Sequence, residues 1–350
     1  MFNFIKNLFK KPESKYGKGG VPNQFDARDY DWTELGSASL PFDWSKGFDI
    51  ESKLQTQLVT KDQNGSFSCG GQAFSYLGEV LEAIATGTYE PRSAKFSYSQ
   101  VFYPGGGSTA RDNADIAIKQ GWPREVILSS YDMGVPPSEY FMTRFQDITL
   151  PVLQDASLAK GLVYADVSPN IDTVAQAIRD NYGAILLVQG SNNGTWESIY
   201  PKPPIKTEWR HFLYAGKAVM LNGKKYIVVK NSWGNVGVDG WQWLGEEWFG
   251  GAVQQVTTMV FKTEVVIPPA FRHNFKTNLT FGENNGEVKA LQQALYIEKC
   301  FPDGVPFTGY FGNITANANL KFQLKYGITP TSANNCGPKT RAKLNEIFFA

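Results

Sequence analysis

The apolar residues of this chain change their period near residue 184, and this change limits the possible folds more than any other feature. Helical spacing is found first, over about 69–86, 110–119 and 171–180. Strand-like runs follow, over 184–188, 212–221, 225–230 and 252–261. The Asn222-Gly223 pair between two of these runs predicts a two-residue hairpin of type I′. Helices followed by an antiparallel sheet predict an α+β fold.

Four regions are expected along the chain. Residues 1–39 are rich in Gly, Pro and Lys and are predicted to be a leader or a strap across the domain that follows. Residues 40–263 form the main domain, and 264–278 are a linker stiffened by Pro268-Pro269. Residues 279–350 carry three helical patterns, over 288–297, 314–326 and 338–348, and are predicted to be a small helical domain.

Composition and charge exclude several classes of protein. A net charge of +1 does not favour a nucleic-acid partner. The sequence has no apolar run of about 18 residues, so no transmembrane segment is expected. Three cysteines are too few for a disulfide framework. We expect no metal and no cofactor, and we expect a monomer.

One cysteine stands apart from the other two. Cys69 follows turn-forming residues and leads directly into a helical pattern. A thiol at a helix N-terminus lies at the positive end of the helix dipole, which favours the thiolate. The sequence therefore predicts a nucleophile at Cys69. A buried cysteine that packs as a small apolar residue is the alternative.

A thiolate nucleophile needs a base, and only His211 and His273 are available. His211 begins the first strand of the predicted hairpin and Asn231 ends the second, so the hairpin is expected to bring them together. The Asn231 amide oxygen would then fix the imidazole tautomer, with Trp233 shielding that bond from water. Taken singly, a residue such as His211 is more often a satisfied strand histidine, and a stretch such as 231–234 is more often an ordinary turn. His273, beside the linker, is expected to have no catalytic role.

An amide donor lies close behind the nucleophile. Gln63 is six residues before Cys69. Its side-chain N–H could stabilise an oxyanion together with the backbone N–H of Cys69. Acyl transfer requires a nucleophile, a base, a group that orients the base and an oxyanion donor. The sequence supplies all four in Cys69, His211, Asn231 and Gln63, and their joint order is more informative than any one of them.

These residues, in this order, resemble those of the papain-like cysteine peptidases. The spacing of Gln63 and Cys69 is similar, and His211 follows Cys69 by 142 residues, within the range of about 130–150. Asn231-Ser232-Trp233-Gly234 matches the asparagine motif of that family. Leu40-Pro41 with Asp43-Trp44 resembles the start of its mature domain, and Gly106-Gly107 its substrate-pairing loop. The resemblance covers about 40–263 and implies a two-lobe fold, helical on one side and antiparallel β on the other.

The chain also departs from this family pattern. Gly70 follows the nucleophile where the family has Trp, which suggests more open space in the cleft. Ser66 replaces a cysteine, and the usual disulfides of the domain are absent. Arg210 precedes His211, and a nearby cation would lower the imidazolium pKa. The long inhibitory prosegment of many relatives is missing, so at most residues 1–39 could serve that purpose.

The C-terminal region has a resemblance of its own. Residues 288–295, 308–312 and 337–341 resemble the three-helix peptidoglycan-binding modules, over about 279–349. This implies binding of cell-wall glycopeptide, and a structural cap or spacer is the alternative. Cys300 and Cys336 flank the predicted bundle. A bridge between them would stabilise it by about 3–4 kcal/mol, with two unpaired thiols as the alternative.

The sequence therefore predicts an endopeptidase in which Cys69 attacks a peptide carbonyl, His211 moves the proton, Asn231 orients His211, and Gln63 holds the oxyanion. Gly106, Gly107 and Trp233 are expected to contact a polypeptide substrate. The C-terminal module would tether the enzyme to peptidoglycan or another cell-surface glycan, in an extracellular or cell-envelope location. Two alternatives remain: a hydrolase that cuts peptidoglycan peptide stems, and a catalytically silent envelope-binding protein.

Overall fold

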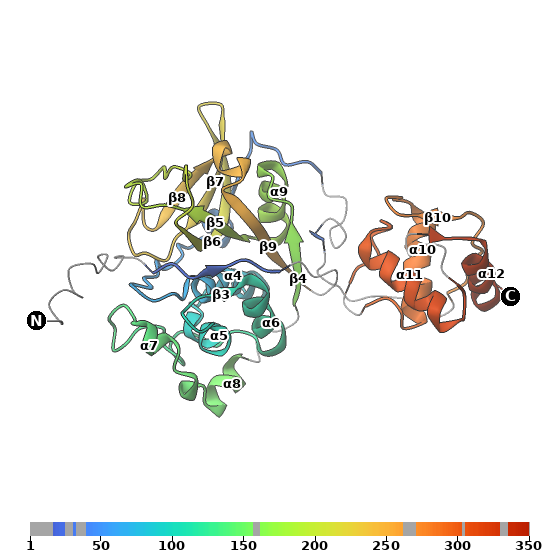
Figure 1. Cartoon of the computed structure of the whole chain (residues 1–350), viewed down its shortest axis with the longest axis horizontal. Helices are drawn as coiled ribbons and strands as arrows, with labels where there is room; N and C mark the ends of the chain where they lie inside the picture. The colour runs from blue at the N-terminus through green and yellow to red at the C-terminus, as the bar shows by residue number, and fades with distance from the viewer. Residues whose placement is uncertain are drawn as a thin grey trace, which may run out of the picture. The chain divides into compact units, whose positions relative to one another are not determined.

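The computed structural model of the chain describes residues 17–24, 31–32, 40–156, 162–261, 271–302, 305–329 and 335–349. The fold is α+β, as predicted, and resolves into two compact units (Figure 1). The first comprises 1–23, 42–160 and 168–257, and the second 24–41, 161–167 and 258–350. Residues 264–270 of the predicted linker lie outside the described residues, and the predicted domain boundaries remain predictions.

Helices form the first part of the first unit, and the sequence patterns locate the longer ones. In chain order they are α3 (Ile50–Leu54), α4 (Cys69–Thr86), α5 (Ala94–Val101), α6 (Ala110–Gln120), α7 (Glu139–Met142), the 3-10 turn η1 (Phe145–Asp147), α8 (Leu150–Ala156) and α9 (Ile171–Asn181). Helices α4, α6 and α9 confirm the three predicted helices. The α4 helix ends at Gly87, which takes the left-handed conformation that glycine adopts without strain (φ 76°).

The longer strands of this unit follow the helices, as the change of period predicted, and three two-residue strands lie earlier in the chain. They are β1 (Gly20–Val21), β2 (Phe48–Asp49), β3 (Ser108–Thr109), β5 (Ala184–Gly190), β6 (Trp209–Leu221), β7 (Lys224–Lys230), β8 (Trp241–Gly245) and β9 (Val253–Phe261), with a 3-10 turn η2 (Glu246–Gly250) after β8. An antiparallel sheet runs in the order β9-β5-β6-β7-β8, and β2 pairs with β6. The inner strand β5 is almost entirely buried, which explains its unbroken apolar sequence.

The hairpin of β6 and β7 determines the position of the site. Asn222 and Gly223 both have positive φ, at 51° and 73°, as a type I′ turn requires. The resulting register pairs Tyr214 with Lys230. His211 and Asn231 therefore lie near one another at the same end of the hairpin, far from its turn.

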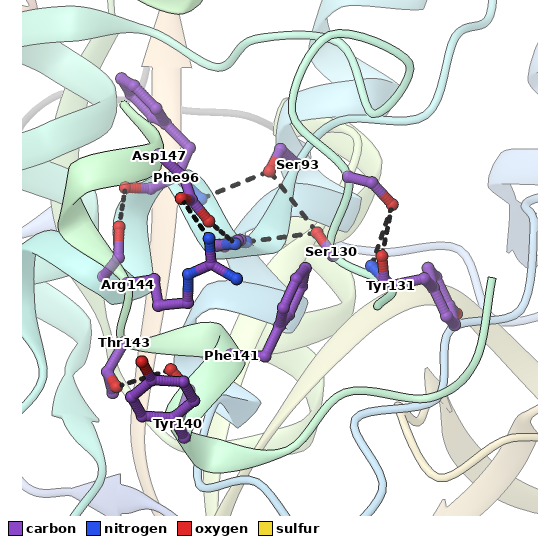
Figure 2. Close-up of polar contacts among 12 residues, drawn as sticks. Ser93, Phe96, Ser130, Tyr131, Tyr140, Phe141, Thr143, Arg144 and Asp147 are labelled. Atoms are coloured by element: carbon purple, nitrogen blue, oxygen red, sulfur yellow. Dashed lines mark hydrogen bonds and ion pairs between the residues drawn. The ribbon is translucent and has the colours of Figure 1, made fainter. Parts of the chain in front are cut away.

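A polar network fixes the start of α5, which packs beside α4 (Figure 2). The Ser93 hydroxyl accepts a hydrogen bond from the Phe96 N–H at 3.3 Å, and the Ser130 hydroxyl accepts from the N–H groups of Ala94 and Lys95. These hydroxyls satisfy first-turn donors that have no partner within the helix. The network therefore fixes the first turn of α5, the helix that packs against the one carrying Cys69.

The second unit contains the small helical bundle. The unit also includes β4 (Leu162–Val167), which pairs with β9 and is not part of the bundle. The bundle consists of β10 (Leu279–Thr280), α10 (Gly286–Ile297), α11 (Asn313–Lys325), β11 (Asn335–Cys336) and α12 (Pro338–Phe348). The three helices confirm the three C-terminal patterns, with Pro338 in the first turn of α12. At the centre of the bundle, the Gln292 amide donates to the Tyr310 carbonyl at 2.9 Å and accepts from the Gly309 N–H at 2.9 Å.

The expected bridge in this bundle is not formed. Cys300 and Cys336 are both free and buried. The Cys300 thiol donates to the Glu298 carbonyl at 3.5 Å, and Cys336 lies on β11, which pairs with β10. The prediction of a disulfide is thus corrected to two unpaired thiols. Apolar packing and the Gln292 network hold the bundle together without it.

Candidate active site

His211 and Asn231 meet at the end of the β6–β7 hairpin. The His211 Nε2 and Asn231 Oδ1 atoms are 2.9 Å apart, and both residues are fully buried. Because an amide oxygen only accepts, Nε2 carries the proton and Nδ1 keeps its lone pair. Nδ1 has no hydrogen-bond partner among the described residues. It is therefore the atom that can accept a proton.

A chain of amides determines this tautomer. Asn231 Nδ2 donates to Gln242 Oε1 at 2.8 Å. Gln242 Nε2 in turn donates to the backbone carbonyls of Trp196 and Ser198, at 2.7 and 2.9 Å. Since those carbonyls can only accept, the orientation of the Gln242 amide is fixed, and with it that of Asn231.

Trp233 covers the His211 side of the site. Its ring stacks on the imidazole with centroids 4.3 Å apart and planes inclined by 29°. Trp233 is itself nearly buried. The indole thus separates the bond between His211 and Asn231 from solvent, which is the shielding that the sequence predicted for it.

Cys69 is the first residue of α4 and faces β6. The backbone N–H groups of Phe212, the neighbour of His211, and of Gly19 and Gly70 act on its sulfur in the direction that lowers the pKa. Burial raises the pKa of the thiol to about 11, in spite of these donors. The expectation of a thiolate at the helix start is therefore wrong for this state, because loss of water outweighs the helix dipole.

The imidazole is also neutral in this state. Burial lowers the pKa of His211 to about 3, the bond to Asn231 opposes that shift, and the Lys18 ammonium adds to it. The cation that acts on His211 is thus Lys18. Arg210, which the sequence suggested, instead donates through Nε to Gln254 Oε1 at 2.5 Å.

Gln63 is held in a donor orientation beside Cys69. Its Nε2 donates to the carbonyls of Ser66 and Gly17, at 2.7 and 3.2 Å. Its Oε1 accepts from the Ser232 hydroxyl at 2.6 Å. The two carbonyls can only accept, so they fix which end of the amide carries N–H, and the Ser232 hydroxyl completes the set by donating to Oε1. Nε2 thus points to a position that a carbonyl oxygen occupies.

That carbonyl belongs to the chain itself. Residues 17–21, which we term the cleft segment, run across the site. The Gly17 carbonyl accepts from Gln63 Nε2 and also from Trp233 Nε1 at 3.0 Å. The Gly19 carbonyl accepts from the Ser108 N–H at 3.0 Å, and β1 pairs in parallel with β3. The cleft segment therefore covers Cys69 and His211 and accounts for their complete burial.

Positions 17 and 19 of the cleft segment have no room for a side chain. A Cβ on Gly17 would lie 1.6 Å from the Ser66 carbonyl oxygen, and one on Gly19 would lie 1.9 Å from that of Phe67. Both contacts are with backbone and cannot be relieved by a side-chain rotation. The Gly19 backbone N–H is close enough to the Cys69 sulfur to act on the pKa of its thiol.

The glycine loop contacts the same segment. Gly106 and Gly107 have φ values of 95° and 89°, and a Cβ on Gly107 would lie 2.4 Å from the Gly19 carbonyl oxygen. Of the two residues predicted to pair with a substrate main chain, Gly107 therefore lies along residue 19, and Gly106 lies against the Phe67 side chain. Their role toward a substrate stays a prediction.

Gly70 does not open the cleft. A Cβ there would lie 2.4 Å from Ser108 Oγ and 2.8 Å from Asn113 Nδ2. The side chains of β3 and α6 fill the space that a larger residue would need, so the suggestion of open space is corrected to close packing.

Sequence reasoning missed several residues that support the site. Ser232 was visible inside the asparagine motif, but its contact with Gln63 spans 169 positions and no local pattern reveals it. Gln242 lies on β8 and gave no signal at all. The predicted strap pointed to residues 1–39 without locating the cleft segment, although Gly17, Gly19 and Gly20 were available as a clue.

The described residues contain neither a cluster of metal ligands nor a helix that could span a membrane. Among them, no group of three or more His, Cys, Asp or Glu side chains could hold a metal ion. None of the described helices combines the length and apolar character needed to cross a membrane.

Comparison with known proteins agrees with the fold. The structure is similar to xylellain, a cysteine protease from Xylella fastidiosa (TM-score 0.58, 20% identity, 73% of this chain and 99% of the other). It is also similar to procathepsin L2 from Tenebrio molitor (0.54, 17%, 72% and 81%) and to bromelain from Ananas comosus (0.50, 20%, 61% and 98%). The chain thus has the fold of the papain-like cysteine proteases, as the resemblance implied.

The C-terminal resemblance is confirmed at the level of sequence family. Residues 284–344 match the family described as putative peptidoglycan binding domain. A comparison with curated proteins gave no match.

Proposed function

We propose that the protein is a cysteine endopeptidase. His211 Nδ1 takes the proton of Cys69, and the sulfur attacks a peptide carbonyl carbon. The carbonyl oxygen becomes an oxyanion that Gln63 Nε2 and the Cys69 N–H stabilise. His211 returns the proton to the leaving amine, and water then hydrolyses the thioester by the same route in reverse. Asn231 keeps the imidazole in the required tautomer.

The observation that carries this proposal is the hydrogen bond from Gln63 Nε2 to the Gly17 carbonyl. A peptide carbonyl rests on the predicted oxyanion donor while the main chain continues past the thiol. A site that binds a peptide main chain in this way is suited to a polypeptide substrate. A phosphate or a metal ion would need charged ligands, and the cleft contacts described above are main-chain and amide groups.

The proposal includes a latent state. The cleft segment occupies the position that a substrate needs, so it must leave before catalysis. Its departure would admit water to Cys69 and His211 and remove the burial that keeps both neutral. The pKa of the thiol would fall and that of the imidazole would rise, which favours proton transfer between them.

The second unit is proposed to hold the enzyme at its place of action. A match to a peptidoglycan-binding family favours peptidoglycan, or another surface glycan, as the ligand. An extracellular or cell-envelope location follows from this ligand. The same match supports the second candidate function, which is hydrolysis of peptidoglycan peptide stems.

Substitutions in the cleft segment of the full chain test the proposal. Gly19→Ala places a methyl group against the Phe67 carbonyl and should displace the segment. Gly65→Ala is the matched control, because a Cβ at Gly65 meets nothing within 4 Å. An epoxide-type thiol inhibitor should label Gly19→Ala at Cys69 much faster than wild type or Gly65→Ala. Casein cleavage should rise in parallel and vanish in Gly19→Ala combined with Cys69→Ala.

The outcomes separate the candidate functions. Casein cleavage that persists without Cys69 would refute the mechanism. Loss of turbidity of purified cell walls, without casein cleavage, would favour the stem hydrolase. Labelling of Cys69 with no turnover of either substrate would leave the silent binding protein as the correct description.

A further inference from the structure

A pocket of about 360 Å³ opens beside the catalytic histidine, and three tryptophans form much of its wall. Trp196, Trp209 and Trp233 meet there, with ring centroids 4.9 to 5.7 Å apart. Asn192 and Glu197 supply polar groups. We call this the tryptophan pocket. Its wall continues directly into the active site, because Trp233 also stacks on His211.

The cleft segment contributes a cation to the wall of this pocket. The Lys18 Nζ donates to Asn192 Oδ1 at 2.8 Å and lies 4.7 Å from the centroid of the Trp209 ring. Asn192 is itself fixed, because its N–H donates to Glu208 Oε2 at 2.8 Å and its Oδ1 also accepts from Trp209 Nε1 at 3.3 Å. An ammonium therefore meets an amide oxygen and an aromatic face at once.

The charge around the pocket favours a cation. Partial burial lowers the pKa of Lys18, and the Glu208 carboxylate opposes that effect. A neutral side chain of the same length would lose the contact with Asn192 and the attraction of both the ring and the carboxylate. A carboxylate side chain would be repelled by Glu208 and would face the negative side of the indole ring.

The position of the pocket relates it to one side of the cleaved bond. Gly17 rests on Gln63 and Trp233, and the next side chain, that of Lys18, enters the pocket. His211 is the group that would protonate the leaving amine, and the tryptophan pocket lies on the His211 side of the cleft. A side chain in this pocket would thus belong to the leaving half of a substrate.

We propose that the tryptophan pocket is a specificity subsite for a lysine side chain on the leaving side of the scissile peptide bond, and that Lys18 occupies it in the latent state. The inference rests on the proposed peptidase function. The occupant is an alkylammonium group, because a single donor atom is held by Asn192 Oδ1 over one ring.

The first test needs no peptidase activity. In the full chain, Lys18→Met keeps the length of the side chain and removes its charge. We expect Cys69 to react about tenfold faster with iodoacetamide, because the cleft segment has lost one of its anchors. Glu208→Gln should act in the same direction, and the double variant should add little. Lys53→Met and Glu246→Gln, on exposed residues outside the pocket, are the matched controls.

The second test uses the full chain with Gly19→Ala, so that the cleft is open. Peptides that differ only in the residue after the scissile bond are compared, with lysine, arginine, norleucine or glutamate there. We expect lysine to exceed norleucine about tenfold in kcat/KM, mostly through KM, and glutamate to be poorest. Glu208→Gln and Trp209→Leu should abolish the preference for lysine without abolishing cleavage of the norleucine peptide.

The two tests fail differently. Equal cleavage of the lysine and norleucine peptides would overturn the subsite and leave the peptidase function standing. If no peptide is cleaved, the peptidase function fails. The labelling rates then still decide whether the pocket binds an alkylammonium, and an unchanged rate in Lys18→Met would overturn that as well.

Discussion

The Ser232 hydroxyl donates a 2.6 Å hydrogen bond to the side-chain oxygen of Gln63, and this contact orients the proposed oxyanion donor. Without it, only the Ser66 carbonyl holds the amide once the cleft is open, and Gln63 Nε2 is directed less firmly at the developing negative charge. In the Gly19→Ala background, Ser232→Ala should therefore lower kcat about tenfold with little change in KM, a smaller loss than that from removing an oxyanion donor directly.

A double-variant cycle checks this assignment. Ser232→Ala should have no further effect once Gln63 is alanine, because the two residues act through one group. Equal losses from Ser232→Ala in both backgrounds would show that Ser232 acts by some other route.

Acid should open the cleft. His211 has a pKa of about 3 when covered, whereas an exposed imidazole has one near 6.5. The open state therefore binds the proton more tightly. The free energy that favours the covered state over the open state falls as pH falls from about 6.5 toward 3. The iodoacetamide reaction of Cys69, corrected for the intrinsic pH dependence of a model thiol, should accelerate over this range.

Raising the pH should also weaken the covered state, in this case because the buried Cys69 thiol ionises. Cys69 has a pKa of about 11 when covered, above the ordinary value of 9.0. The stabilisation from a neutral buried thiol is complete below about pH 9 and is lost as pH rises toward 11. Absorbance of thiolate should thus show Cys69 titrating near pH 11 in wild type and lower in Gly19→Ala. A single midpoint shared by both proteins would contradict the burial effect.

The Gln292 network should matter for the stability of the small bundle. Its Nε2 donates to the Tyr310 carbonyl and to Thr315 Oγ1 at 3.0 Å, and its Oε1 accepts from Gly309. Gln292→Leu leaves these buried groups without partners and should destabilise the second unit by about 2–3 kcal/mol. Gln293→Leu, next in the chain and less buried, should change stability by less than about 0.5 kcal/mol in urea unfolding.

The thiols of the chain can be counted directly. Since Cys300 and Cys336 are unpaired, three thiols per chain should react with a disulfide reagent in denaturant without reductant. The melting temperature of the second unit should not depend on added reductant. One reactive thiol, and a transition that reductant lowers, would indicate the bridge that the sequence suggested.

Local patterns were sufficient for the elements that have strong periodicity. Helices α4, α6 and α9 and the hairpin at Asn222-Gly223 follow from apolar spacing and turn chemistry. The same hairpin brings His211 beside Asn231, so that part of the site could be predicted as well. The short elements β1, β2 and β3 could not, because two-residue strands carry no period.

The ionisation of the site could not be predicted for a different reason. A helix start beside Cys69 favours a thiolate, but this effect is worth only about 0.3–1 kcal/mol, and burial of a thiol exceeds it. Burial depends on the cleft segment, some 50 positions earlier in the chain. The bond from Gln63 to Gly17 spans 46 residues. Contacts of this kind leave no local trace except the glycines themselves.

Those glycines have a consequence for how the protein can evolve. Every substitution of glycine adds a Cβ, and at Gly17 and Gly19 that atom would overlap main-chain oxygens of the opposite wall. The latency that we propose therefore depends on codons that tolerate no missense change, whereas neighbouring Pro22 is exposed. On that proposal, mutational drift in this stretch would produce constitutively active lineages far more readily than inactive ones.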